Sequence, residues 1–341
     1  MQGSPSRRRV SIADVARLAG VSSQTVSRVS TGHTGVVEST RRLVLDAMRE
    51  LGYRPNGAAR ALKRGSFRTI GVIVLTLAST GNSRTVEAIA AQAAREGYAI
   101  TLIPVTAPIR EGFQGAFTRL GELAVDGVIV IMEAHLLDAT DVTPPPGMQV
   151  VAVDSDAGDH YPVVDTDQAD GARQAVRHLL DLGHDAVWHV TGPAESFSAQ
   201  RRARAWRQVL ESSCRLVPPV ERGDWSAASG YTAGLRLAEE AACTAIFAAN
   251  DQMALGVLRA LHERGRRVPS EVSVVGFDDT PDAASYLPPL TTIHQDFVEV
   301  GRRCVQRLLE QIRDERSEPG TILVPTVLVQ RSSTAPPPVG S

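Results

Sequence analysis

From Thr69 onward, short apolar runs alternate with helix-length amphipathic segments. The runs have the length of buried strands, and the segments between them have the length of covering helices. Such alternation is typical of parallel sheets with helices on both faces, so it predicts an α/β core. The expected strands are residues 70–77, 99–105, 128–132, 150–153, 186–190, 245–249 and 272–277.

This part of the chain is too long for one sheet, since about 270 residues follow Arg68. Two proline clusters, at 144–146 and 288–289, also interrupt the alternation. We therefore predict a two-lobed core over residues 69–331. A ligand of such a fold is expected outside the carboxyl ends of the strands, in the crevice between the lobes.

The first 68 residues follow a helical period instead. Apolar residues recur on either side of Gly20, at Ile12, Val15, Ala16 and Ala19 before it and at Val26 and Val29 after it. This spacing predicts a helix, a tight turn and a second helix. Ser11, paired with Asp14, and Ser22 are suited to cap the two helices. A third helix is expected over residues 39–51, with Leu43, Ala47 and Leu51 toward a small core and Arg41 and Arg42 outside.

The N-terminal part also differs in charge from the rest. Residues 1–68 hold 13 of the 36 basic and 4 of the 38 acidic residues, about +9, which leaves 23 against 34, about −11, for the remainder. A basic module on an acidic body indicates a polyanion partner, because Lys and Arg that neutralise phosphates release counterions. A disordered basic tail is the alternative, and the regular apolar spacing argues against it.

The start of the second helix holds the residues of this module that we expect to contact DNA. In a helix-turn-helix, side chains at this end reach base edges in the major groove. Gln24 is able to bond adenine with two hydrogen bonds, and Arg28, one turn later, guanine or a phosphate. For Ser22 and Thr25, ordinary capping is an equal alternative. The candidate DNA-binding residues of this helix are Ser22, Ser23, Gln24, Thr25, Ser27 and Arg28.

The segment that follows is a candidate hinge. Asn56 is a good N-cap and Ala59 and Leu62 favour a helix, yet the segment is short and contains Gly57. Alone in water such a helix is marginal, so we expect it to fold only when docked on DNA, with an apolar residue as a wedge. Asn56, Ala59 and Leu62 are its candidate contacts. A plain interdomain linker is the alternative.

Composition excludes several classes of protein. With 43% hydrophobic and 22% charged residues the chain is typical of soluble globular proteins. We see no stretch as apolar as a membrane span and no signal peptide, and we expect a cytoplasmic protein. Three separated cysteines and eight histidines without metal-ligand spacing predict neither a disulfide nor a metal site. Because G-x-G-x-x-G and Walker motifs are missing, we expect no nucleotide and no cofactor.

Polar residues at the expected strand ends suggest a sugar site in the core. Asp154, Asn250 and Asp278 each follow a predicted strand, and Arg202 and Trp225 lie in segments that are able to reach the same space. Vicinal hydroxyls need two-pronged donors and acceptors, and the C–H face of a sugar needs a flat apolar ring. Three neighbours of these residues are given structural roles instead: Asp251 as a helix N-cap, Asp279 as a turn former and Arg201 as a solvated residue.

Several segments together resemble the lactose repressor (LacI/GalR) family of bacterial transcription regulators. They are VSIADVARLAGVS at 10–22, QTVSRV at 24–29, GYRPN at 52–56, ERGDWSA at 221–227, ANDQMALG at 249–256, SVVGFDDT at 273–280 and PPLTTI at 288–293. The similarity extends over about residues 10–331 and is weakest at about 78–150.

The resemblance implies roles for individual residues. It places Ser23, Gln24 and Arg28 at base-reading positions and Leu62 at the leucine that wedges into the minor groove. It also implies a sugar site. In that site Asp154, Arg202, Asn250 and Asp278 bond hydroxyls, Trp225 stacks, and Gln295 and Phe297 line the wall.

The resemblance also implies the domain limits. They are a headpiece at 1–54, a hinge at 55–68, one lobe at about 69–165 and 295–324, and a second lobe at about 166–294 and 325–331. Residues 332–341 contain three prolines, which preclude a coiled coil, so we expect a disordered tail and a homodimer rather than a tetramer.

Together these features predict a repressor that a sugar, expected to be a galactoside, releases from a palindromic operator. A corepressor ligand that strengthens DNA binding is the nearest alternative. More distant ones are a sugar-processing enzyme with Asp154 and Asp278 as paired carboxylates, and an extracytoplasmic sugar-binding protein. We assign no catalytic residue.

Overall fold

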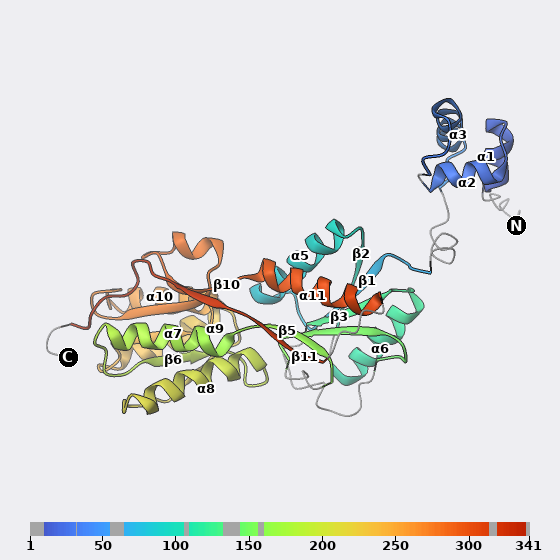
Figure 1. The fold of residues 1–341 in the computed structure, drawn as a ribbon. Helices are drawn as coiled ribbons and strands as arrows, with labels where there is room; N and C mark the ends of the chain where they lie inside the picture. Colours follow the sequence, from blue (N-terminus) through green and yellow to red (C-terminus); the bar gives the residue numbers. More distant parts are fainter. Residues whose placement is uncertain are drawn as a thin grey trace, which may run out of the picture. The chain divides into compact units, whose positions relative to one another are not determined.

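The computed structural model describes residues 10–31, 33–54, 65–105, 109–131, 144–155, 160–313 and 319–338. The chain divides into two compact units, Met1–Phe67 and Arg68–Ser341, which are described separately (Figure 1). Among the described residues, no helix combines the length and the apolar character that crossing a membrane requires.

The first unit is a bundle of short helices, as the sequence predicts. Its helices are α1 (Ile12–Ala19), α2 (Ser23–Ser30) and α3 (Glu38–Glu50). Ser11 and Asp14 form a complete capping box on α1, and Gly20 ends that helix in the left-handed region with φ +65°. Ser22 caps α2. Both predicted caps are therefore confirmed.

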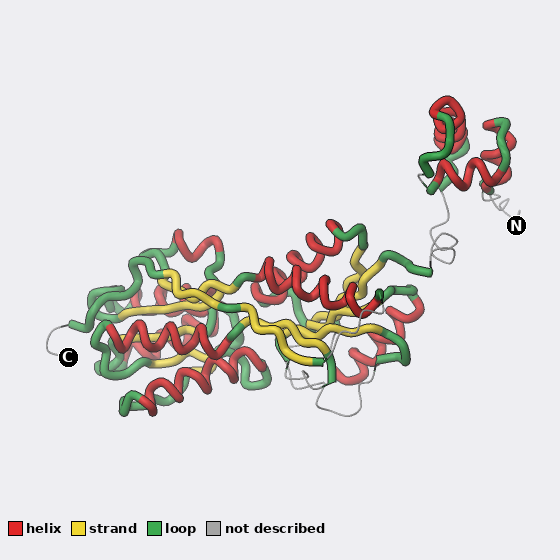
Figure 2. The backbone as a smooth tube through the Cα atoms, in the orientation of Figure 1, coloured by secondary structure: helices red, strands yellow, loops and turns green. Residues whose placement is uncertain are grey.

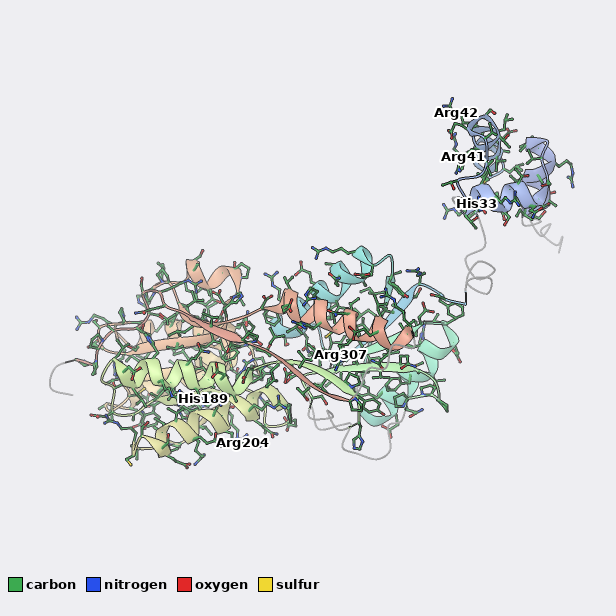
Figure 3. All side chains as sticks on the ribbon, in the orientation of Figure 1. His33, Arg41, Arg42, His189, Arg204 and Arg307 are labelled. Carbon is green, nitrogen blue, oxygen red and sulfur yellow. The ribbon has the colours of Figure 1, made fainter. Side chains whose placement is uncertain are left out.

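The face of α3 differs from the expectation. Val44, Ala47 and Met48 are buried against α1 and α2, whereas Leu43 is 57% exposed. The expected residues 43, 47 and 51 are spaced four apart, which exceeds the 3.6 residues of one helical turn, so they do not stay on one face of the helix. Residues 44, 47, 48 and 51 follow the 3.6-residue period and lie on one face. Arg42 is exposed, and Arg41 is half-buried and donates to the His33 carbonyl (2.6 Å; Figure 3).

The second unit is an α/β core with two sheets, and the predicted fold class is confirmed (Figure 2). The strands of the first sheet, in spatial order, are β11 (Gly320–Val324), β5 (Pro162–Thr166), β4 (Gln149–Val153), β3 (Gly127–Ile131), β1 (Thr69–Val74) and β2 (Ala99–Pro104). Those of the second sheet are β12 (Thr326–Val329), β10 (Thr291–Gln295), β9 (Ser273–Asp278), β8 (Ala245–Ala248), β6 (Trp188–Thr191) and β7 (Glu221–Arg222). All neighbours pair in parallel except β12, which runs antiparallel to β10.

Helices cover both faces of each sheet. In lobe 1, which contains the first sheet, α5 and α11 share one apolar core with the sheet and α6 lies on the other face. In lobe 2, which contains the second sheet, α9 and α10 cover one face and α7 and α8 the other. The helices are α5 (Thr80–Arg95), α6 (Ile109–Glu122), α7 (Gln168–Asp181), α8 (Phe197–Ser212), α9 (Ala227–Glu239), α10 (Asp251–Glu263) and α11 (Phe297–Ile312), with a 3-10 helix η2 (Pro281–Ser285).

The chain passes between the lobes three times. The connections are β5 to α7, β10 to α11, and β11 to β12. They are neighbours in space, because Val324 of β11 pairs with Thr166 of β5, and Thr326 of β12 pairs with Gln295 of β10.

Every predicted strand overlaps an observed one, but β5, β7, β10, β11 and β12 are not in the prediction. The strand β10, Thr-Thr-Ile-His-Gln, has too many polar residues to read as an apolar run, and β11 and β12 are short strands at the sheet edges. Edge strands bury one side only, so hydrophobicity marks them weakly.

The expected disorder of the C-terminal tail is wrong for residues 332–338. Ser333 is completely buried, and its hydroxyl donates to the Val274 carbonyl (2.6 Å) and accepts from the Thr291 amide (2.8 Å). The Ala335 amide donates to the Ser273 hydroxyl (3.0 Å). Prolines prevent a helix but not an extended segment, which here satisfies backbone groups at the edge of lobe 2. Residues 339–341 lie outside the described residues.

Candidate functional site

The outer face of α2 presents the predicted base-reading residues. Ser23, Gln24 and Arg28 are exposed, and their side chains form no hydrogen bond or ion pair with any described residue. Ser22 is committed to capping, since its Oγ accepts from the Thr25 amide (3.1 Å) and bonds the Thr25 hydroxyl (2.9 Å). Ser27 is half-buried. Gln24 and Arg28 are four residues apart on one helix face, which suits contact with neighbouring bases. The predicted hinge contacts Asn56, Ala59 and Leu62 lie outside the described residues.

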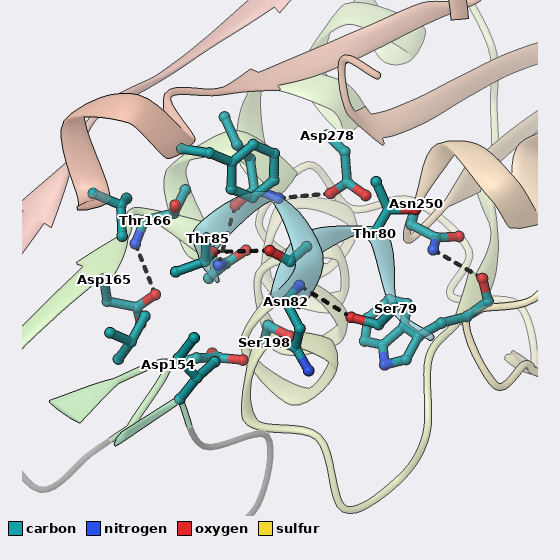
Figure 4. Close-up of a pocket in the computed structure, with 18 of the residues that line it drawn as sticks. Ser79, Thr80, Asn82, Thr85, Asp154, Asp165, Thr166, Ser198, Asn250 and Asp278 are labelled. Carbon is teal, nitrogen blue, oxygen red and sulfur yellow. Dashed lines mark hydrogen bonds between the residues drawn. The ribbon is translucent and has the colours of Figure 1, made fainter. Parts of the chain in front are cut away.

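All seven predicted sugar residues line one cleft between the lobes of the core (Figure 4). The cleft encloses about 580 Å³ of empty space, its open mouth included. The seven are Asp154, Arg202, Trp225, Asn250, Asp278, Gln295 and Phe297. Asp154 and Phe297 come from lobe 1, and the others from lobe 2.

A closed ring of four polar side chains forms the centre of the site. Arg202 Nε donates to Gln168 Oε1 (2.8 Å), and Gln168 Nε2 donates to Gln295 Oε1 (3.5 Å). Gln295 Nε2 donates to Asp278 Oδ1 (2.6 Å), and the Arg202 guanidinium lies 3.8 Å from the same carboxylate oxygen. All four residues are at most 5% exposed. The ring fixes their orientation before any ligand arrives, as a preorganised site requires.

Burial dominates the electrostatics of this ring. It lowers the pKa of Arg202, against the opposing effect of Asp278 and other carboxylates. It raises the pKa of Asp278 to about 6, although the Arg202 charge pulls that pKa down. The Arg202 guanidinium carbon also lies over the Phe277 ring, 3.7 Å from its centroid, and Nη1 donates to the Ala249 carbonyl. These partners hold a charged guanidinium that would otherwise be costly to bury.

Backbone strain gathers at this cleft. Asp154, Trp225 and Asp278 have φ of +53°, +72° and +116°, in the region that side chains other than glycine rarely adopt. Each such residue costs about 1–3 kcal/mol, and such residues cluster at ligand sites.

Asn250 and Trp225 are coupled. Asn250 Oδ1 accepts from the Met253 amide and so caps α10, while its Nδ2 donates to the Trp225 carbonyl (3.0 Å). The Trp225 ring lies against Gly192, where an added Cβ would come within 2.5 Å of it. Trp225 Nε1 is buried and has no hydrogen-bond partner among the described residues.

Three structural interpretations from the sequence are wrong or incomplete. Asp251 is not the N-cap of α10, because Asn250 occupies that position; Asp251 is fully buried and accepts from Thr292 Oγ1 (2.6 Å) and the Thr280 amide. Burial and the nearby Asp278 charge raise the pKa of Asp251 to about 8.

Arg201 and Asp279 are the other two. Arg201 is not solvated, since it forms a 2.7 Å ion pair with buried Asp165 of lobe 1, whose pKa burial raises to about 6. Asp279 forms ion pairs with Arg331 (2.6 Å) and His294 (3.0 Å), and no turn is assigned at this position.

Sequence reasoning missed most of the cleft wall that lobe 1 supplies and two residues of lobe 2. The first turns of α5 line the cleft, together with two residues from β5 and, beyond the predicted ones, one each from α7 and α8. The sequence does contain a signal for the residues at the start of α5, because this polar segment follows the first strand of the core in the same way that Asp154 follows a later strand. The missed polar residues are Ser79, Thr80, Asn82, Thr85, Asp165, Thr166, Gln168 and Ser198.

Comparison with known proteins agrees with both units. The model for bacterial regulatory proteins of the lacI family matches residues 11–56, and the periplasmic binding protein-like domain matches residues 176–334. The chain is 39% identical to the lactose operon repressor of Escherichia coli (strain K12), over 96% of this chain and 91% of that protein. It is 33% identical to the transcriptional repressor PurR of Haemophilus influenzae (strain PittEE), over 88% of this chain and 90% of that protein.

Solved structures give the same result. The lac repressor dimer bound to operator and the anti-inducer ONPF matches with a TM-score of 0.87 and 36% identity, over 96% of this chain and 100% of that chain. The complex of the transcriptional regulator CelR with cellobiose matches with a TM-score of 0.71 and 30% identity, over 95% and 100%.

A helix-turn-helix unit joined to a two-lobed, periplasmic-binding-protein-like core defines a class of DNA-binding transcription regulators. Within that class, the chain belongs to the lacI family of bacterial regulatory proteins and is a DNA-binding transcriptional repressor.

Proposed function

We propose that a neutral sugar, a galactoside in the first instance, binds in the cleft and releases the repressor from a palindromic operator. One observation carries the proposal: Asp154, Arg202, Asn250, Asp278 and Trp225 line a single cleft. Carboxylates, an amide and a guanidinium pair with vicinal hydroxyls, and the indole offers a flat face to the C–H groups of a pyranose.

The charge of the cleft supports a neutral ligand. Asp154, Asp165 and Asp278 line it, and Arg202 is the cationic residue among its lining residues in the described part of the chain. An anionic effector would have to overcome this excess of carboxylates. The likeness to the CelR–cellobiose complex also supports a sugar.

In the proposed mechanism two copies of the chain bind DNA together. The two α2 helices enter the major groove of the two half-sites, with Ser23, Gln24 and Arg28 on base edges and Ser22, Thr25 and Ser27 beside the backbone. Asn56, Ala59 and Leu62 contact the central step. The likeness to the lac repressor dimer on its operator supports this arrangement. Sugar reaches both lobes at once, so it favours one lobe orientation and changes the spacing of the headpieces.

The coupling between the sites is reciprocal, because a sugar that weakens DNA binding must itself bind more weakly to the DNA complex, by the same factor.

The test begins with selection of an inverted-repeat fragment from random DNA. Fluorescence anisotropy then measures its affinity with and without each sugar. Induction predicts a Kd for DNA that rises by about tenfold or more, roughly 1.4 kcal/mol of coupling. A Kd that falls instead would identify a corepressor, and no change with any sugar would refute control by a sugar.

The contacts of the carboxylates favour binding over catalysis. Asp278 is held by Gln295 and Arg202, and we assign neither it nor Asp154 a catalytic role. Incubation with an aryl galactoside tests this, since steady release of the phenol by the purified protein would indicate a glycosidase.

A further inference from the structure

Apolar packing in the core stays within each lobe. Among the described residues, every buried apolar cluster of the core belongs to one lobe, and none combines side chains of both. The cleft lies between the lobes, and so does a second hollow, which α5 lines on lobe 1 and Asp279, Thr280 and Pro281 line on lobe 2. Apolar burial therefore stabilises each lobe and does little to fix the orientation of one lobe relative to the other.

An ion pair does cross from one lobe to the other. Arg201 Nη1, on α8 of lobe 2, donates to Asp165 Oδ2, on β5 of lobe 1, at 2.7 Å. The remaining ion pairs between described residues of the core each join two residues of the same lobe. Of the charged contacts that the structure describes in the core, this pair alone responds directly to the orientation of the lobes.

Each partner of this pair is held in place by its own lobe. Asp165 is 2% exposed, and its Oδ1 accepts from the Thr166 amide (2.7 Å), which leaves Oδ2 toward Arg201. The Arg201 guanidinium carbon lies over the ring of Phe197, one turn earlier on α8, 4.0 Å from the ring centroid. Because both side chains are already positioned, the pair loses less side-chain entropy on forming than an ion pair on the surface does.

The electrostatics tie the ionised form of Asp165 to this contact. Burial raises the pKa of Asp165 to about 6, and the Arg201 charge is the largest of the effects that lower it. A buried carboxylate that loses its partner is costly, so the pair is worth keeping once the lobes have brought it together. An ion pair extends to about 4 Å between nitrogen and oxygen, so a relative shift of about 1–2 Å between α8 and β5 is enough to break it.

We propose that the ion pair of Arg201 and Asp165 is a latch, which holds the two lobes of this chain in the described orientation. A ligand or partner that turns the lobes away from this orientation has to break the latch. The latch thereby contributes to the free-energy difference between the lobe orientations and sets part of the effector concentration needed to change them. This inference does not depend on which class of ligand the cleft takes.

The test is a distance measurement between the lobes of the full chain by pulsed electron paramagnetic resonance. One spin label is attached to Cys214, which is exposed on lobe 2, and the other to Gln114→Cys, at an exposed position of α6 on lobe 1. Cys243 and Cys304 are buried. Labelled chain is mixed with an excess of the same chain without labels, so that the measured distances lie within one chain, and pH 8 keeps Asp165 ionised.

The variants remove the latch from either side. Arg201→Met and Asp165→Asn should each raise the share of the distance distribution outside the wild-type peak by about threefold or more. The double variant should not exceed the larger single effect, because both substitutions remove the same pair. Arg201→Lys keeps the charge and should stay close to the wild type. The matched control is Arg236→Met, which removes a 2.6 Å ion pair with Glu221 inside lobe 2 and should leave the distribution unchanged.

A wild-type distance distribution in Arg201→Met would show that other contacts orient the lobes, and it would overturn the latch. Additive effects in the double variant, or an equal change in Arg236→Met, would overturn it as well. If Asp165→Asn misfolds by circular dichroism, the comparison of Arg201→Met with Arg201→Lys decides, since the first should differ from the wild type and the second should not. The measurement uses neither DNA nor sugar, so its failure leaves the proposed function standing.

Discussion

Arg202 is the residue whose replacement separates effector binding from DNA binding most sharply. Arg202→Met keeps the apolar stem of the side chain, which packs in lobe 2, and removes the guanidinium. The substitution removes the hydrogen bonds to Gln168 and to the Ala249 carbonyl, and it removes the positive charge near Asp278. The headpiece belongs to the other compact unit and loses nothing.

The structure gives the expected size of both effects, the loss of sugar affinity and the loss of folding stability. Hydrogen bonds from a charged donor contribute about 1.5–3 kcal/mol each, so losing two bonds to sugar hydroxyls weakens sugar binding by about 3 kcal/mol or more, roughly 150-fold. Removing one partner of a buried ion pair usually costs about 3–5 kcal/mol. Here the cost is smaller, because Asp278 has a pKa of about 6 even beside Arg202 and becomes neutral at pH 7 for about 1.4 kcal/mol or less. We therefore expect a folded protein that melts a few degrees lower.

The assay is anisotropy of labelled operator DNA, titrated with protein and then with the inducing sugar. Arg202→Met should bind DNA within about twofold of the wild type and need about 100-fold more sugar for release. Arg204→Met is the control, since Arg204 lies on the same helix but is exposed (Figure 3). Release of DNA by the Arg202 variant at the wild-type sugar concentration would show that the cleft is not the effector site.

Three further predictions concern other parts of the molecule. Sugar should prefer the Asp278 carboxylate as acceptor, so affinity by calorimetry should be close to full about one pH unit above the pKa of about 6 and fall as the pH drops through that pKa. Asp278→Asn should depend less on pH, with Asp165, whose pKa burial also raises to about 6, as the remaining cleft carboxyl; a flat wild-type profile would contradict this. Ser333→Ala removes two buried hydrogen bonds at about 1 kcal/mol each and should lower the Tm by about 4–8 °C, whereas Ser332→Ala, at an exposed side chain, should not; equal effects would argue against the docked tail. Gln24→Ala should lose about 1–3 kcal/mol of discrimination at one base pair in a binding selection, and an unchanged operator preference would remove Gln24 from the base-reading set.

Sequence rules predicted the structure well where they depend on only a few neighbouring residues. The caps at Ser11 and Ser22 need only a short polar side chain before a helix, and the alternating runs of the core need only burial. The polar residues after strands gathered in one cleft because the carboxyl ends of parallel strands share one edge of a sheet. Asp154 and Asp278 could be found this way although they are 124 positions apart in the sequence.

Prediction failed where a residue's role depends on a distant partner. Arg201 looks solvated in sequence because nothing nearby shows that Asp165 of the other lobe lies 2.7 Å away. The tail looks disordered because its partners, Ser273 and Thr291, are some 40 to 60 residues earlier in the chain. The N-cap of α10 is Asn250 and not Asp251, one position later, and helix propensity alone does not resolve a difference of one residue.

The three neighbouring passages of the chain between the lobes have a practical consequence for dissecting this repressor. Neither lobe is one uninterrupted stretch of polypeptide, so cutting the gene at any single point cannot yield an isolated half with a complete sheet. A protease nick in one passage leaves two covalent tethers, and the fragments should migrate together until denatured. Studies of one half in isolation will need a rewired chain, with β11 or β12 joined to the rest of its own sheet by a designed loop.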